Sequence, residues 1–287
     1  MKIYELFKQK RPVLSFEVFP PKPSLSFDSV FESVSTLASY KPDYVSVTYG
    51  AAGSTRGRTL DLAQMIKIKY GVEALAHTTG VLLDEVQLDK LLDEIDIRGL
   101  DNILALRGDV PQGGSDADLK FHASDIVRLI RKREGRFCIG VAAFPECHPQ
   151  SKSVEDDLKY LKQKLDTGAD FMVTQMCFDN ELILRFRDRV RQLGITQPMT
   201  IGIMPVFAVG QIAHISSMCG AVIPDELKQT MEKYSDDSAS MLKAGIEFAS
   251  KQITDLIAQD FEGIHIYTMN RPELAHGILV QTGLRNL

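Results

Sequence analysis

Short apolar segments recur along the whole chain, and most are followed by a stretch with the residue spacing of a helix. Strands that alternate with helices in this way predict parallel βαβ units. Most of the segments end in polar or ionisable residues, as barrel strands do when an active site lies at their carboxyl ends. The pattern therefore favours an α/β fold of the (β/α)8 type, the TIM barrel. The predicted strands are Val13–Phe19, Tyr44–Tyr49, Glu73–Thr79, Asn102–Arg107, Phe137–Phe144, Asp170–Met176, Met199–Met204 and Ile264–Met269.

The predicted helices place apolar residues at spacings of three and four. The connection between the last two strands has room for three helices, so we expect extra helices there within the barrel domain. No linker rich in Pro, Gly or Ser divides the chain, and residues 1–287 are expected to form one (β/α)8 barrel domain. The predicted helices are Phe27–Tyr40, Leu60–Tyr70, Asp84–Ile97, Ser124–Arg133, Ser153–Thr167, Glu181–Leu193, Gly210–Cys219, Pro224–Tyr234, Asp236–Ala258 and Pro272–Gln281.

A doubly wound open sheet is the alternative architecture for alternating strands and helices. Such a sheet usually carries a glycine-rich turn after its first strand, where a nucleotide binds. Here the first predicted strand is followed by Pro20-Pro21-Lys22-Pro23, which contains no glycine. The sequence therefore favours the closed barrel.

Composition argues against several classes of function. The formal net charge of -5 and the pI of about 5.7 argue against a nucleic-acid-binding surface, which needs a basic face. No apolar segment approaches the roughly 20 residues that span a bilayer, and the charged segment Met1–Lys10 lacks the apolar core of a secretory signal. We therefore expect a cytoplasmic protein without a membrane partner. The 4 cysteines form no Cys-x-x-Cys pair, so neither a metal site nor a disulfide is expected.

Glu17 lies within the apolar segment Ser15–Pro21, where an ionisable side chain is unusual. In a barrel strand it points either into the barrel or toward the helix layer. Apolar surroundings disfavour the ionised carboxylate, which suits a general acid. A structural salt bridge, for example to a Lys or Arg of a neighbouring strand, explains the residue equally well.

Two further segments combine small and polar residues at predicted strand ends. Val47–Ser54 can bring backbone N–H groups close to a phosphate, although a tight turn is the simpler explanation. Arg107 and Asp109 flank a glycine. They form either an ion pair with each other or a site in which Arg107 binds an anion next to the acidic Asp109. Gln175 can hydrogen-bond the edge of a heterocycle or satisfy a backbone group of the core.

Two histidines are well placed for the rim of the barrel, because His77 and His148 follow the third and fifth predicted strands. Their spacing gives no support for a metal site. We interpret the histidines at 214, 265 and 276 as structural residues.

Eight motifs span nearly the whole chain: Ser15–Lys22 (SFEVFPPK), Val47–Thr55 (VTYGAAGST), His77–Gly80 (HTTG), Asn102–Pro111 (NILALRGDVP), Ala142–Pro149 (AAFPECHP), Gly168–Asp179 (GADFMVTQMCFD), Gly202–Pro205 (GIMP) and Tyr267–Arg271 (YTMNR). In this order they resemble the methylenetetrahydrofolate reductase family, specifically the catalytic domain of its bacterial type. Each motif alone is weak, but their shared order makes the resemblance specific.

This resemblance implies a flavin enzyme that reduces 5,10-methylenetetrahydrofolate to 5-methyltetrahydrofolate in one-carbon metabolism and methionine supply. FAD would be reduced by NADH or NADPH, which leaves before the folate binds in a ping-pong mechanism. By the same resemblance, Glu17 is the general acid that protonates N10 of the folate, and Asp109 is the acidic residue beside flavin and pterin. A homo-oligomer is expected, and a protein electron donor in place of the nicotinamide stays open.

The resemblance also assigns binding residues. Arg107 and Lys164 match FAD contacts and suit its pyrophosphate. Well-known bacterial members carry Tyr at the position of His122 and Phe at the position of Val209. Phe207, two residues before Val209, offers a substitute for the missing Phe ring. These two departures affect the expected contacts with the folate and the nicotinamide. The implied cofactor-binding residues are Thr48, Tyr49, Ala51, His77, Arg107, Gly108, Asp109, His122, Ala123, His148, Asp157 and Lys164, and the implied substrate-binding residues are Gln175, Phe207, Tyr267 and Arg271.

Two other functions stay open for this sequence. One is a flavin-free, pterin-binding barrel that transfers a one-carbon unit, and the flavin-type residues Arg107, Asp157 and Lys164 speak against it. The other is a non-catalytic subunit that binds a partner protein, and Glu17, Asp109 and Gln175 speak against that.

Overall fold

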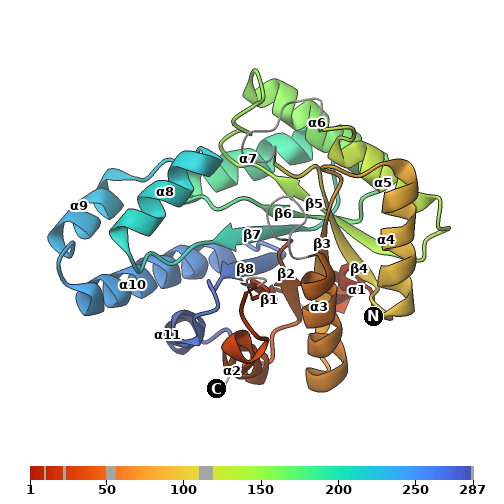
Figure 1. Ribbon diagram of the computed structural model, residues 1–287. Coiled ribbons are helices and arrows are strands. Elements are labelled where there is room, and N and C mark those ends of the chain that lie inside the picture. The colour runs from red at the N-terminus through yellow and green to blue at the C-terminus, as the bar shows by residue number, and fades with distance from the viewer. Residues whose placement is uncertain (10, 22–23, 50–55, 110–118, 286–287) are drawn as a thin grey trace.

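Eight parallel strands close into a barrel in the order of the chain (Figure 1). The computed structural model describes residues 1–9, 11–21, 24–49, 56–109 and 119–285. β8 pairs with β1, with Ser15 opposite His265 and Glu17 opposite Tyr267, so the predicted barrel is confirmed and the open sheet is excluded. The strands are β1 (Val13–Val18), β2 (Tyr44–Val47), β3 (Glu73–Thr79), β4 (Asn102–Leu106), β5 (Cys138–Ala143), β6 (Phe171–Thr174), β7 (Met199–Ile203) and β8 (Gly263–Tyr267).

Helices surround this barrel, and every predicted helix is present in the described residues. The sequence pattern does not predict α1, because 7 residues are too few to show helical periodicity. The bounds are α1 (Ile3–Gln9), α2 (Asp28–Ser39), α3 (Arg56–Tyr70), α4 (Glu85–Ile97), α5 (Ala123–Arg131), α6 (Val154–Asp166), α7 (Asn180–Gln192), α8 (Val209–Cys219), α9 (Asp225–Lys233), α10 (Ser238–Ala258) and α11 (Pro272–Thr282).

The long connection between β7 and β8 forms the three expected helices, which extend to one side of the barrel in Figure 1. A separate apolar cluster holds them to the barrel. It combines Met176 and Met204, which follow β6 and β7, with Leu227 of α9 and Met241 of α10. The extension is therefore packed onto the carboxyl ends of two strands, beside the barrel opening.

Polar side chains fix the starts of several helices. The Ser153 hydroxyl accepts a hydrogen bond from the Asp156 amide at 3.1 Å, and Asp156 and Asp157 lie in the acidic first turn of α6. Asp84 and Gln87 form a reciprocal capping box at α4. Such caps satisfy the free N–H groups of a first helical turn and contribute roughly 1 kcal/mol each.

The barrel interior changes character along its axis. Toward the amino ends of the strands it is apolar, and α1 closes this end with Ile3, Leu6 and Phe7. Further along the strands, the buried inward-facing residues become polar. The apolar layer consists of Val13, Tyr44, Leu75, Leu104, Cys138, Phe171 and Val173, and the polar one includes Ser15, Glu17, Ser46, His77 and His265.

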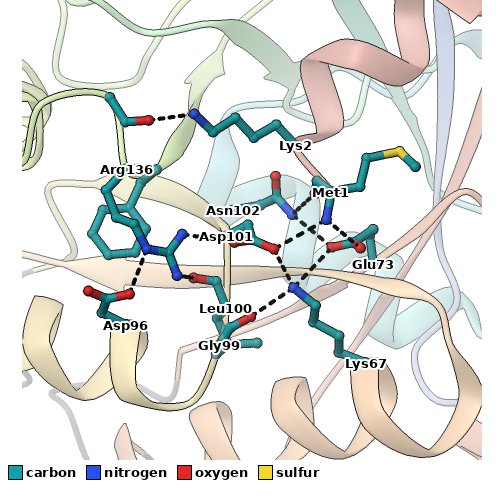
Figure 2. Close-up of polar contacts among 12 residues, drawn as sticks. Met1, Lys2, Lys67, Glu73, Asp96, Gly99, Leu100, Asp101, Asn102 and Arg136 are labelled. Atoms are coloured by element: carbon teal, nitrogen blue, oxygen red, sulfur yellow. Dashed lines mark hydrogen bonds and ion pairs between the residues drawn. The ribbon is translucent and has the colours of Figure 1, made fainter.

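Charged and amide groups gather where α1 meets the amino ends of β3 and β4 (Figure 2). Lys67 of α3 pairs with Asp101 and lies 3.6 Å from Glu73. Arg136 pairs with Asp101 at 2.8 Å. Asn102, which is 0% exposed, accepts from the Ile3 amide at 2.8 Å and donates to the Met1 carbonyl at 3.1 Å. One buried amide side chain thus attaches α1 to the barrel.

We predict that Asn102→Ala lowers the free energy of unfolding by about 1–3 kcal/mol, because it leaves the buried Ile3 amide without its acceptor. Urea denaturation monitored by circular dichroism measures the change. Gln192→Ala, at an exposed position of α7, serves as the control and should change stability by less than about 0.5 kcal/mol. Equal stability of the two variants would contradict the role of Asn102.

Candidate active site

A cavity of about 940 Å³ opens among the carboxyl ends of β2 to β6 and the loops that follow them. This is the end of a (β/α)8 barrel at which active sites lie. Its volume is near the upper end for small-molecule sites, roughly 300–1,000 Å³, so it has room for a large ligand. Most of the expected cofactor residues line it, together with one expected substrate residue: Tyr49, His77, Arg107, Gly108, Asp109, His122, Ala123, His148, Asp157, Lys164 and Gln175.

Several lining residues are not predicted from the sequence. Thr79 is 8% exposed, and its hydroxyl has no hydrogen-bond partner among the described residues, so it can bond a ligand in the cavity. Phe144 lines the wall and packs edge-on against His148, with ring centroids 4.6 Å apart. Thr79 stands two residues after His77 in β3, and strand alternation is the signal that would have placed both on one face.

The backbone at Gly108 requires glycine. Its φ of +88° is in the left-handed region, and an added Cβ would lie 2.8 Å from the Val81 side chain. This conformation places Gly108 and Asp109 along the cavity wall, where the Asp109 side chain is exposed. The described contacts show no ion pair between Arg107 and Asp109, and the Arg107 Nε donates instead to the Gly108 carbonyl at 3.2 Å.

Asp157 holds the loop after β5 against the start of α6. Its carboxylate accepts from the His148 amide at 3.2 Å and from the Ser151 hydroxyl at 3.1 Å. The His148 Nδ1 accepts from the Gln150 amide at 3.1 Å, which leaves Nε2 as the protonated nitrogen of a neutral ring. Burial first, and then the charge of Arg107, lower the pKa of His148, whereas Asp157 opposes the shift.

Lys164 carries its ammonium group to the cavity wall. Its Nζ donates to the Ala142 carbonyl of β5 at 2.5 Å. Burial lowers the pKa of Lys164 to about 8, and the negative charge of Asp157 partly opposes this shift. The two residues lie on the same side of α6, as their spacing of seven predicts. Arg107 and Lys164 therefore supply positive charge to one cavity.

Glu17 points into the barrel and is 8% exposed. Its Oε2 lies 3.5 Å from Nε2 of His77 and 3.4 Å from Nε2 of His265. No Lys or Arg among the described residues pairs with it. Its partners are the imidazoles of His77 and of His265 on the neighbouring strand β8, so a structural role for Glu17 stays open beside that of an acid. His77 also lines the cavity, and this places the Glu17 carboxyl group next to the cavity floor.

The two histidines differ in their contacts. Nε2 of His77 lies 2.6 Å from the Ser46 hydroxyl, and burial lowers the pKa of His77 to about 4, against the opposing charge of Glu17. His77 is therefore uncharged at neutral pH. His265 contacts Ser15 through Nδ1 at 2.8 Å. The sequence suggests only a structural role for His265, because its contact with Glu17 exists only once β1 and β8 are paired.

Tyr267 spans the interior above His265. Its hydroxyl donates to the Thr174 carbonyl at 2.9 Å, and its ring packs edge-on against His265 at 5.0 Å. Burial raises the pKa of Tyr267 well above its usual value, so the phenol stays neutral. Gly202 makes room for this ring, because an added Cβ would lie 2.7 Å from the Tyr267 hydroxyl and 2.5 Å from the Thr174 carbonyl.

The remaining expected residues lie outside the described cavity lining. Arg271 packs its guanidinium 4.5 Å from the centre of the Phe207 ring, so these two expected substrate residues do meet. Val209 begins α8 and packs in the apolar cluster of the extension. The Thr48 carbonyl accepts from the Thr59 hydroxyl at 2.9 Å. Ala51 lies outside the described residues.

Among the described helices, none combines the length and apolar character that a bilayer crossing requires. The described residues contain no group of three or more His, Cys, Asp or Glu side chains that could hold a metal ion. All four cysteines are free thiols.

Fold and cavity together define a (β/α)8-barrel protein with a large ligand site and a buried carboxyl group beside it. Residues 2–283 match the family described as methylenetetrahydrofolate reductase, and the chain belongs to that family. It is 37% identical to the 5,10-methylenetetrahydrofolate reductase of Pectobacterium carotovorum subsp. carotovorum over 277 residues, which cover 96% of this chain and 92% of the relative.

Plant relatives are longer. The chain is 35% identical to methylenetetrahydrofolate reductase (NADH) 1 of Arabidopsis thaliana over 298 residues, covering 99% of this chain and 50% of that protein. The chain therefore spans about half the length of these plant relatives. A solved structure with the same fold is an uncharacterized Clostridium thermocellum protein that binds two copies of 5-methyl-5,6,7,8-tetrahydrofolic acid, with a TM-score of 0.73, 12% identity and 99% coverage of both chains.

We predict that Gly202→Ala destabilises the fold by about 1–3 kcal/mol, because the new methyl group overlaps the Tyr267 ring and a β6 carbonyl. Thermal and urea unfolding measure the effect. Gly210→Ala is the matched control, because an added Cβ there meets nothing within 4 Å in α8, and it should be neutral or slightly stabilising. An unchanged stability for Gly202→Ala would show that Tyr267 does not occupy this position.

Proposed function

We propose that this protein uses FAD to reduce 5,10-methylenetetrahydrofolate to 5-methyltetrahydrofolate, with NADH or NADPH as reductant in a ping-pong mechanism. The observation that carries the proposal is the position of Glu17. Its carboxyl group contacts His77, and His77 lines a cavity large enough for a dinucleotide. Family membership supports the substrate, and the name of the Arabidopsis relative, which specifies NADH, supports that reductant.

The residues of the cavity fit FAD. Arg107 and Lys164 offer cations to a pyrophosphate, which binds best to groups of this kind. The unpartnered Thr79 hydroxyl and the amide of Gln175 offer hydrogen bonds to the edge of a ring system. The Phe144 ring and the Val81 side chain offer apolar surface to the ring system of a ligand. When bound, the flavin would supply the hydride chemistry that no amino-acid side chain supplies.

The protein supplies a proton and electrostatic stabilisation. The methylene bridge of the folate becomes a hydride acceptor when its ring opens to an iminium cation, which requires a proton at N10. Glu17 gives that proton, and general acids of this kind contribute roughly 10²–10⁴-fold. Asp109, exposed to the cavity, places a negative charge near the cation, and Gln175 orients the pterin.

The same cavity serves both substrates in turn. Its lining includes the cations of Arg107 and Lys164 and the uncharged polar side chains of His77 and Gln175. A nicotinamide and a pterin are both flat heterocycles, and each can stack in the same place. Alternate occupation of one site explains why the nucleotide must leave before the folate binds.

Anaerobic spectroscopy of the wild-type protein tests the proposal. The protein is purified, loaded with FAD if needed, reduced with NADH or NADPH, and then mixed with 5,10-methylenetetrahydrofolate. We expect bleaching of the flavin bands by the nicotinamide and their return with the folate. A flavin that stays reduced would contradict the substrate, and failure to bind FAD would favour the flavin-free barrel.

We predict that Glu17→Gln separates the two half-reactions. Reduction of the flavin by the nicotinamide should stay within about twofold of wild type, because that step needs no acid. Reoxidation by the folate should slow by roughly 10²–10⁴-fold, the usual contribution of a general acid. Stopped-flow absorbance measures both rates. An equal loss in both half-reactions would remove Glu17 from the role of acid.

We predict that FAD binds more weakly as the pH rises through the pKa of Lys164, which is about 8. Below that pH the ammonium is charged and attracts the pyrophosphate, and above it the neutral amine does not. The loss between pH 7 and pH 9 should be roughly tenfold, since a hydrogen bond to a charged group contributes about 1.5–3 kcal/mol. Quenching of flavin fluorescence measures the affinity.

Lys164→Met should weaken FAD binding at pH 7 and make it nearly independent of pH over this range. Lys159→Met, on the exposed side of the same helix, should keep the pH dependence of the wild type. A pH dependence that survives in Lys164→Met would assign it to another group.

A further inference from the structure

His265 is held on all sides in the barrel interior. Its side chain is 1% exposed, and its ring stacks on Tyr44 at 6.4 Å and meets the edge of Tyr267 at 5.0 Å. Both ring nitrogens have polar partners. Nδ1 lies 2.8 Å from the Ser15 hydroxyl, and Nε2 lies 3.4 Å from Oε2 of Glu17. The imidazole therefore connects a serine to the carboxyl group of the proposed acid.

His77 contacts the same carboxyl group in a different way. Its Nε2 is shared between Ser46, at 2.6 Å, and Glu17, at 3.5 Å, so the shorter contact belongs to the serine. His77 also lines the cavity, whereas His265 does not. His265 thus contacts Glu17 and other residues of the barrel interior, and it does not reach the cavity.

The two oxygens of Glu17 are not equivalent. Both imidazoles contact Oε2, and no residue in the described ranges forms a hydrogen bond with Oε1. The backbone next to the carboxyl group is fixed as well, because the Thr268 hydroxyl donates to the Glu17 carbonyl at 2.6 Å. An N–H donor on Oε2 favours a proton on the other oxygen of a carboxylic acid.

We propose that His265 is a positioning residue that keeps the transferable proton of Glu17 on Oε1. In this proposal the Ser15 hydroxyl donates to Nδ1 of His265 at 2.8 Å and not to the more distant Ile264 carbonyl at 3.4 Å. The ring then carries its proton on Nε2, and this N–H donates to Oε2 of Glu17. The inference deepens the proposed function and rests on Glu17 acting as the acid there. It assigns to β1 and β8 a role in orienting the acid.

The proton transfer itself needs only the Glu17 carboxyl group and N10 of the folate. The Oε1–H bond of Glu17 breaks, a bond from that proton to N10 of the folate forms, and the electron pair stays on the carboxylate. The Nε2–H of His265 continues to donate to Oε2 and stabilises the new negative charge. Water that enters the emptied cavity returns a proton to Oε1 after turnover.

Besides His265, two titratable groups among the described residues face Glu17. They are His77 on β3, which is uncharged at neutral pH because burial lowers its pKa to about 4, and Tyr267 on β8, which is neutral because burial raises its pKa. From β2, the facing group is the Ser46 hydroxyl, which carries no charge. A change in the pH profile on substitution of His265 can therefore be assigned to the contact between His265 and Glu17.

The tautomer of His265 tests the geometry without any turnover. Protein labelled with ¹⁵N at histidine gives ring signals that distinguish the Nε2–H tautomer, the Nδ1–H tautomer and the imidazolium, and His265→Gln identifies the signals of His265. We expect the Nε2–H tautomer at neutral pH, and Ser15→Ala should reduce its share. An Nδ1–H tautomer or an imidazolium at His265 would overturn the proposal.

A matched pair of variants tests the effect on the reaction. His265→Gln keeps an N–H donor near the position of Nε2, whereas His265→Met fills similar space without one. We expect folate-dependent reoxidation of the flavin to slow by about 100-fold in His265→Met, within the range of general acid effects. In His265→Gln the loss should stay below about tenfold, because the donor is retained.

The controls separate the possible outcomes. Flavin reduction by the nicotinamide should change little in either variant, which shows that both fold and bind FAD. Both variants lose the buried contact with Ser15, so each is expected to unfold at a lower temperature, and the rates are compared below both transitions. Equal folate rates in the Gln and Met variants would overturn the positioning role. If the wild-type protein itself failed to reduce the folate, the proposed function would fail, and the NMR result would still decide whether Nε2 of His265 carries the proton that is donated to Oε2 of Glu17.

Discussion

Closure of the barrel is the constraint on which the rest of the structure depends. Once β8 pairs with β1, alternate side chains of all eight strands share one interior, and each must find a partner there. Toward the amino ends, apolar side chains and α1 fill this space. Toward the carboxyl ends, Glu17 is buried and must be satisfied by polar neighbours. Closure brings His265 of β8 and His77 of β3 to the same carboxyl oxygen.

Electrostatics then divides the site into two parts. The outer part carries charge, with Arg107 and Lys164 in the cavity wall and Asp109 exposed to the same space. The inner part consists of groups that burial keeps neutral at physiological pH, namely His77 and Tyr267. Anionic parts of a ligand belong to the outer part, where cations are available. The proton transfer that we propose belongs to the inner part, where few competing charges surround Glu17.

The sequence predicts the strands, most helices and the barrel, because apolar periodicity is a local property that survives into the fold. It also places Arg107, Asp109 and Gln175 at strand ends, where the cavity forms. It does not predict the contact between Glu17 and His265, which are 248 residues apart and meet only through closure. Thr79 is missed for another reason, since a threonine in a strand gives no sign that its hydroxyl will lack a partner. The positions of Arg271 and Phe207 depend on the packing of α8 and α11, which motifs do not encode.

The central proposal is that the carboxyl group of Glu17, held inside the barrel, supplies the proton of the reaction. Infrared difference spectroscopy of wild-type protein against Glu17→Gln, with ¹³C-labelled glutamate, tests it most directly at neutral pH. The account predicts a carboxylic-acid C=O band that is present in the wild type and absent from the variant. A carboxylate band in its place, with no acid band, would contradict the account.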